Sequence, residues 1–208
     1  MPKIVDPEAR RRDVVDALFR VVVRDGLQRA SLRAVAGEAG LNIGSVRHYF
    51  AGQRELMEFV MRAMLDRVTR RLLCGVEEIG DLGAYARAER LRLVAGLLSE
   101  LLPLDGRRRA EVVVFLEFTL AARTDPAFAE IARQTAVGTR RLLRRVLVRL
   151  DESGTLPHGR DLGVEVERLA ALLDGLGQAA VVHPDVLGPA RCEEVLVTHL
   201  EELAGGGR

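Results

Sequence analysis

Cysteine is scarce and long apolar runs are absent in this chain of 208 residues, and each of these features excludes a class of protein. The two cysteines, Cys74 and Cys192, lie far apart and in no CxxC pair, so neither a disulfide framework nor a zinc site is expected. The longest run without Asp, Glu, Lys or Arg is residues 175–184, whereas a membrane helix needs about 20 apolar residues. We therefore expect no membrane span. Because residues 2–12 are polar and unlike a signal segment, the cytoplasm is the expected location.

An excess of charge of one sign is missing from the whole chain but present in part of it. The 31 basic and 30 acidic residues give a net charge of +1, which by itself argues against a nucleic-acid partner. Residues 1–50, however, carry nine basic and six acidic residues, and the other 158 carry 22 and 24. A mildly basic N-terminal part thus precedes a mildly acidic remainder, although a run of charge can equally be a solvated surface.

Glycine and proline divide the chain into segments of helical length. Within these segments apolar residues recur three and four positions apart, which predicts amphipathic helices. The first such stripe consists of Val14, Val15, Leu18, Phe19 and Val22. Residues 112–115 could form a strand, but their apolar pattern continues to residue 122 and favours a helix. Asp125-Pro126 is typical of a helix start. The sequence predicts an all-α fold of about nine helices.

Residues 31–50 carry the pattern that is most informative about function. Ser31 can cap one short helix, Gly40 suits a sharp turn, and Asn42 can cap a second short helix at 43–49. Two short helices joined by a turn of about three to four residues with a glycine are typical of a helix-turn-helix. An ordinary αα-hairpin has the same outline. The N-terminal position, the basic surroundings and the polar second helix favour DNA binding.

At these residues the sequence resembles the tetracycline-repressor (TetR) family of bacterial transcription regulators. The likeness covers residues 14–57, with the motifs Asp25-Gly26-Leu27, Ser31–Ala36, Ala39–Asn42, Gly44-Ser45 and His48-Tyr49-Phe50. A looser likeness, at Phe128 and residues 172–176, is to the C-terminal domain of the choline/betaine-repressor (BetI-like) subgroup. The resemblance implies a three-helix DNA-binding domain at residues 1–53 and a helical effector-binding and dimerisation domain at residues 54–208. The candidate DNA-binding residues are Ser31, Arg33, Asn42, Gly44, Ser45, Arg47, His48, Tyr49 and Arg54.

Two positions depart from the family pattern. Arg47 stands where the family often has tyrosine, and it could either read a guanine or hold a phosphate. Gln53 stands where the family often has a lysine that contacts a phosphate, and Arg54 is the candidate replacement.

The resemblance also implies a homodimer, because two recognition helices related by a twofold axis read a palindromic operator. The candidate interface residues lie on the last two expected helices and are Leu169, Leu172, Leu173, Leu176, Val195, Leu196 and Leu200. For each of them the core of a single chain is the alternative. An effector pocket is expected among the fourth to seventh helices, with the candidates Met61, Met64, Phe115, Glu117 and Phe118. Core packing is the alternative for these residues, and pairing with an arginine is the alternative for Glu117.

An enzyme is not expected, because no residue pattern assembles a catalytic site. The histidines lie apart, and there is no HExxH, no Gly-x-Ser-x-Gly and no phosphate-binding glycine-rich loop. We expect no catalytic residues, metal or cofactor. The predicted function is a dimeric DNA-binding transcriptional regulator, a repressor released from its operator by an unidentified small molecule. The alternative is a helical adaptor without DNA binding, which would need no polar, capped second helix.

Overall fold

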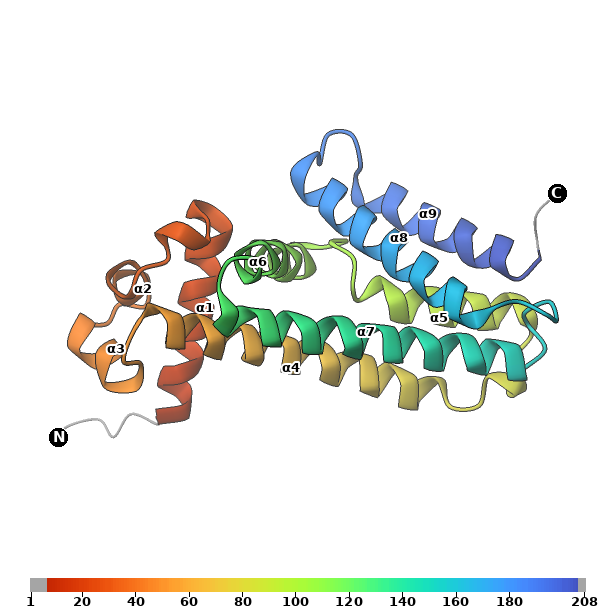
Figure 1. Cartoon of the computed structure of the whole chain (residues 1–208), viewed down its shortest axis with the longest axis horizontal. Helices are drawn as coiled ribbons and strands as arrows, with labels where there is room; N and C mark the ends of the chain where they lie inside the picture. The colour runs from red at the N-terminus through yellow and green to blue at the C-terminus, as the bar shows by residue number, and fades with distance from the viewer. Residues whose placement is uncertain (1–6, 206–208) are drawn as a thin grey trace. The chain divides into compact units, whose positions relative to one another are not determined.

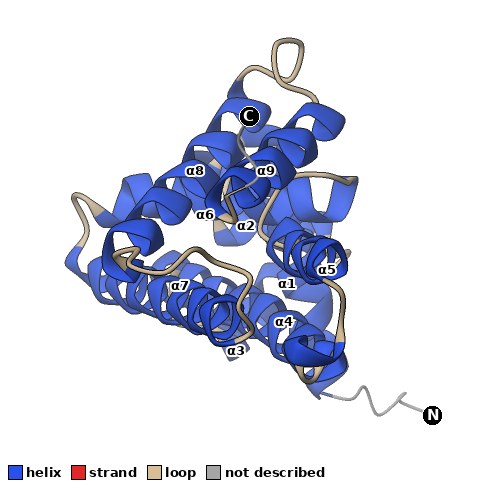
Figure 2. Cartoon of the chain, turned by 90° about the vertical axis from the view of Figure 1, so that its right-hand side faces the viewer, coloured by secondary structure: helices blue, strands red, loops and turns tan. Residues whose placement is uncertain are grey.

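The computed structural model describes the backbone of residues 7–205 and the side chains of residues 13–205. The described residues form nine α-helices, two short 3₁₀ helices and no strand (Figure 2), which confirms the predicted all-α fold. The elements are α1 (Pro7–Asp25), η1 (Leu27–Arg29), α2 (Leu32–Glu38), α3 (Ile43–Tyr49), α4 (Gln53–Ile79), η2 (Leu82–Ala84), α5 (Arg87–Ser99), α6 (Gly106–Ala122), α7 (Pro126–Glu152), α8 (Leu162–Val182) and α9 (Pro189–Leu203). Among the described residues, none of these helices has the length and apolarity needed to cross a membrane. The side chains of Lys3, Arg10, Arg11 and Arg12, which were counted in the basic N-terminal part, lie outside the described residues.

The chain packs as two compact units, which divide three of its helices between them. The first unit is Met1–Asp66 with Val113–Ala132, and the second is Arg67–Val112 with Arg133–Arg208. Helices α4, α6 and α7 each contribute to both units. The first unit therefore extends past the predicted functional boundary at residue 53 and includes a second stretch of chain. That boundary stays a prediction about function rather than a division in the packing.

In the first unit, α1 carries the predicted apolar stripe, and α2 and α3 follow it (red to orange in Figure 1). Val14, Val15, Leu18 and Val22 are at most 2% exposed, while Phe19 lies half-buried at the edge of the stripe. Burial of these side chains is the main force that holds a helix of this length in place.

In the second unit, α8 and α9 lie side by side (blue in Figure 1), and leucines from both enter one apolar core. Side chains form hydrogen bonds with backbone groups at both ends of α8. Asp161 accepts hydrogen bonds from the N–H groups of Gly163 and Val164, and Arg109 donates to the carbonyls of Ala180 and Val181. These contacts satisfy backbone groups that have no partner within the helix.

Candidate nucleic-acid interface

The first turns of α2 and α3 are held by caps that the sequence predicts. Ser31 Oγ accepts a hydrogen bond from Ala34 N at 3.2 Å, and Asn42 Oδ1 accepts one from Ser45 N at 2.7 Å. Gly40 has a φ of +66°, a conformation that other residues rarely adopt. A Cβ at Gly44 would lie 3.2 Å from Asn42 Oδ1, so the small residue protects the cap. The local sequence therefore fixes where α3 begins and how it is oriented within its unit.

The α3 helix has an anchored side and an open side. Val46 is fully buried, and Phe50, directly after the helix, is 3% exposed. Arg47 and His48 are exposed, while Ser45 and Tyr49 are half-exposed. The rings of His48 and Tyr49 meet edge to face, with centroids 5.4 Å apart. The open side thus offers a guanidinium and two polar aromatic groups next to one another, a suitable set for the major groove of DNA.

Some of the basic side chains of residues 1–50 form ion pairs within the fold. Arg20 and Arg24 on α1 bind Glu38 on α2 at 2.7 and 2.9 Å, and Arg24 also binds Asp25. Hydrogen bonds from Arg20 and then Arg24 lower the pKa of Glu38, and the hydrogen bond from Arg24 lowers the pKa of Asp25. These pairs join α1 to α2. A count of charges along the sequence could not separate these arginines from those available to DNA.

Other arginines of the predicted set remain open to a partner. Arg33 and Arg47 are exposed and make no hydrogen bond or ion pair with any described residue. Arg54 is exposed too, but its guanidinium Nη2 lies 3.3 Å from Asp125 Oδ2. The candidate phosphate contact on α4 is therefore paired with a carboxylate of the first unit.

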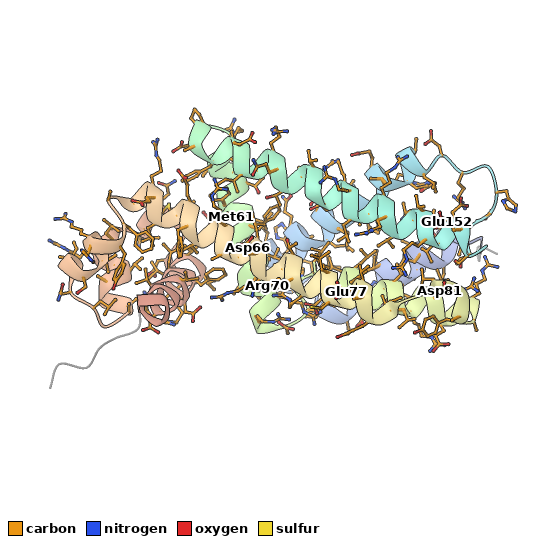
Figure 3. All side chains as sticks on the ribbon, turned by 90° about the horizontal axis from the view of Figure 1, so that it is seen from below. Met61, Asp66, Arg70, Glu77, Asp81 and Glu152 are labelled. Atoms are coloured by element: carbon orange, nitrogen blue, oxygen red, sulfur yellow. The ribbon has the colours of Figure 1, made fainter. Side chains whose placement is uncertain are left out.

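The predicted effector-pocket residues all lie in the first unit, and most of them are core. Met61 (labelled in Figure 3), Met64 and Phe118 are at most 2% exposed, and Phe118 packs against Phe128 with ring centroids 4.6 Å apart. Phe115 and Glu117 are half-buried. No arginine among the described residues pairs with Glu117, whose carboxylate approaches Gly26 at the end of α1.

A recess that the sequence did not indicate lies in the second unit, between α4, α5 and the start of α6. Its volume is about 500 Å³. Its lining combines charged groups of both signs with an apolar wall and a free thiol, and consists of Arg71, Cys74, Gly75, Glu78, Ile79, Leu93, Gly96, Leu97, Glu100 and Arg107. The lining residues of α4 are spaced three and four positions apart, so they share one side of that helix. This spacing is the sequence pattern that could have grouped them.

Charges at the recess are largely paired. Arg71 binds Glu100 at 2.8 Å and both carboxylate oxygens of Glu111 at 2.6 and 3.0 Å. Burial acts to lower the pKa of Arg71, but hydrogen bonds to Glu111 and Glu100 outweigh it and raise that pKa above its ordinary value. Arg107 contacts the same Glu100 at 3.3 Å. These ion pairs hold the charged side chains of the recess in place.

The candidate interface leucines are mostly inside the single chain. Five of the seven residues are at most 7% exposed and belong to the core of the second unit: Leu169, Leu173, Leu176, Leu196 and Leu200. Leu172 and Val195 are partly buried against the same core. The structure thus places five of the seven in the chain's own core, the alternative that the sequence left open, and leaves Leu172 and Val195 at the edge of that core. The exposed side of α8 is a different stripe, spaced alternately by four and three residues: Val164, Arg168, Ala171, Gly175, Gln178 and Val182.

Two comparisons with known proteins show which family the chain belongs to. Residues 87–205 match the family described as BetI-type transcriptional repressor, C-terminal. The transcriptional regulator PksA of Bacillus subtilis (strain 168) is 32% identical over 203 residues, which cover 98% of this chain and 94% of that protein.

The chain belongs to the TetR family.

Solved structures of transcriptional regulators share its fold. A transcriptional regulator from Rhodococcus sp. Rha1 has a TM-score of 0.78 and 31% identity, and the match covers 94% of this chain and 96% of that one. A transcriptional regulator from Saccharomonospora viridis, solved in complex with choline, has a TM-score of 0.78 with 20% identity over 94% and 97% of the two chains. At that identity the likeness concerns the fold alone. Membership of the TetR family makes the chain a DNA-binding transcriptional regulator and not an enzyme. It also argues against the alternative function, a helical adaptor without DNA binding.

Proposed function

We propose that this TetR-family chain is a dimeric repressor that reads a palindromic operator with α3 and leaves it when a small molecule binds. The observation that carries the proposal is the two-sided α3. Val46 and Phe50 anchor the helix, while Arg47, His48 and Tyr49 face away from that anchor. A short helix with this division of residues suits insertion into the major groove.

Each predicted DNA-binding residue has a specific role in this proposal. Arg47 reaches a base edge or a phosphate, and Ser45, His48 and Tyr49 complete the contact surface of α3. Arg33 on α2 and Arg54 on α4 contact the phosphate backbone on either side. Ser31, Asn42 and Gly44 act indirectly, because they hold the first turns of α2 and α3 in place.

Dimerisation is required because one short helix makes too few base contacts to select a site in a genome. The exposed stripe of α8 supports the proposed interface. Ala171 and Gly175 at its centre permit close helix approach, and Val164 and Val182 at its ends are 54% and 56% exposed. Burying these two valines against a second chain would stabilise the dimer. Leu172 and Val195, which are only partly buried, can contribute at its edge.

The recess of the second unit is the proposed effector site. Its lining contains no aromatic side chain, whereas quaternary ammonium groups such as that of choline are typically held by aromatic cages. The apolar wall of Ile79, Leu93 and Leu97 beside charged groups of both signs better fits a ligand with an apolar body and polar substituents. Such a ligand releases DNA only if it binds more tightly to the conformer that does not fit the operator.

The experiment that tests the proposal measures binding of the purified chain to the DNA upstream of its own gene. A repressor of this kind binds that duplex as two chains and prefers it to a scrambled duplex of equal length. Its affinity falls steeply with salt, because contacts with phosphates release counterions. Equal affinity for both duplexes would contradict the proposal.

A further inference from the structure

We infer that Asp125 restrains Arg54 in the DNA-free chain and thereby weakens operator binding. The inference rests on the proposed contact between Arg54 and a phosphate. It assigns a role to a carboxylate that lies 71 positions further along the chain, at the junction between α6 and α7.

The geometry identifies Asp125 as the fixed partner of the pair. Its Oδ1 accepts a hydrogen bond from Ala127 N at 3.0 Å, and its carbonyl accepts one from Phe128 N at 3.1 Å, so it caps the start of α7. Its other carboxylate oxygen, Oδ2, lies 3.3 Å from Arg54 Nη2. The Asp125 side chain is 25% exposed, whereas that of Arg54 is 66% exposed. The guanidinium can therefore move towards a partner, while the carboxylate stays with α7.

Asp125 and a DNA phosphate compete for the guanidinium of Arg54. If Arg54 turns to the phosphate and leaves Asp125, the ion pair is lost. If Arg54 keeps both contacts, the carboxylate remains close to the phosphate and repels it. Either way Asp125 lowers the affinity, by a factor that an exposed ion pair limits to about two- to fivefold. The pair also cancels one positive charge of the DNA-binding surface, which reduces the number of counterions released.

The position of Asp125 also connects the restraint to the rest of the chain. Residues 113–132 pack in the same compact unit as the N-terminal domain, although they follow it by many residues in sequence. Because Asp125 caps the first turn of α7, a displacement of that turn changes how strongly Arg54 is held.

The test is Asp125→Asn, since asparagine keeps the side-chain acceptor that caps α7 but loses the charge. Asp105→Asn is the matched control. Asp105 also accepts a backbone N–H, from Arg108 at 2.7 Å, and pairs with the Arg108 side chain at 2.8 Å, but it lies in the second unit. Binding is measured by fluorescence anisotropy, with a labelled duplex from upstream of the gene, from about 50 to 200 mM salt.

We expect Asp125→Asn to bind about two- to fivefold more tightly at low salt, and its plot of log K against log salt to steepen by up to about 0.9. The gain should disappear in the Arg54→Ala background, and Asp105→Asn should match the unmodified chain. Unchanged or weaker binding by Asp125→Asn, or a gain that persists without Arg54, would overturn the inference. Failure of the unmodified chain to prefer its operator would instead contradict the proposed function.

Discussion

The side-chain oxygen Oδ1 of Asn42 accepts a hydrogen bond of 2.7 Å from the backbone N–H of Ser45, at the first turn of α3. This bond satisfies one of the N–H groups that a helix start leaves without a partner. Asn42→Ala should therefore reduce the free energy of unfolding by about 1 kcal/mol, and Asn42→Ser should retain most of it. Thermal denaturation gives the comparison. Equal stability of the alanine and asparagine proteins would show that the cap does not hold α3.

Arg47 is the residue on which sequence-specific binding should depend most. Arg47→Ala should abolish operator binding and leave the helical circular-dichroism spectrum unchanged, because the side chain is exposed and has no partner among the described residues. Arg141→Ala, at an exposed arginine of α7 in the second unit, is the control and should bind normally.

Arg47→Lys separates the two roles that the sequence leaves open for this residue. A lysine can still hold a phosphate, but it lacks the planar fork of an arginine that reads guanine. Loss of preference among operator variants with retained overall affinity would indicate a guanine contact. Unchanged preference would indicate a phosphate contact.

The two sides of α8 should respond differently to substitution. Ala171→Arg changes the exposed stripe and should convert a species with the mass of two chains into one with the mass of a single chain, without loss of helicity. Ala88→Arg, at an exposed position of α5, is the control. Light scattering after gel filtration measures both masses. An unmodified protein that elutes as a single chain at micromolar concentration would contradict the proposed dimer.

Leu169 tests the assignment of the candidate interface leucines to the core. Its side chain is fully buried in the single chain, so Leu169→Ala should cost about 2–5 kcal/mol of unfolding free energy. Denaturation followed by circular dichroism gives this value. If Leu169 served mainly an interface, the loss would instead appear as weaker dimerisation with little change in the folded single chain.

Cys74 provides a chemical probe of the recess. It is exposed on the recess wall, whereas Cys192 is fully buried and burial raises the pKa of its thiol. A bulky maleimide should therefore attach once per chain, at Cys74, and should reduce operator affinity if occupation of the recess favours the released state. The Cys74→Ser protein, treated in the same way, should bind DNA normally. Full operator binding by the labelled protein would show that occupation of the recess does not release DNA.

His199 should make the protein less stable in mild acid. Burial, followed by the positive charge of Arg168, lowers its pKa below 6.5, although Glu165 and Glu202 act in the opposite direction. A histidine with a lowered pKa in the folded state stabilises the fold above its unfolded pKa, and that contribution is lost as the pH falls. Unfolding free energy should thus decline below about pH 6.5, and less so in His199→Gln. The exposed His158 gives the control, His158→Gln.

The sequence predicted the helices and the caps of α2 and α3 because their signals are local. Caps such as Ser31 and Asn42, the positive-φ Gly40 and the α1 stripe each depend on neighbours a few residues away. The apolar stripes of α8 and α9 were predicted too, but periodicity does not reveal which surface covers a stripe. Leu169 and Leu196 could be assigned to the core only once the packing was known.

The ion pairs between residues far apart in the chain were not predicted from the sequence. Glu38 joins Arg20 and Arg24 across 18 and 14 positions, and Asp125 joins Arg54 across 71. The recess depends on a close approach of α4 to α5, where a Cβ at Gly75 would lie only 2.8 Å from Leu97 Cδ1. Such features arise from tertiary packing, which no local pattern encodes.

Binding of the purified chain to the duplex upstream of its own gene tests the central claim most directly. The measurement is a titration of labelled operator with the unmodified chain and with Arg47→Ala, each repeated with a scrambled duplex and at several salt concentrations. The account predicts that two unmodified chains bind the operator in preference to the scrambled duplex, with an affinity that falls steeply with salt, and that Arg47→Ala no longer binds the operator. Equal binding of both duplexes by the unmodified chain, or undiminished operator affinity of Arg47→Ala, would contradict it.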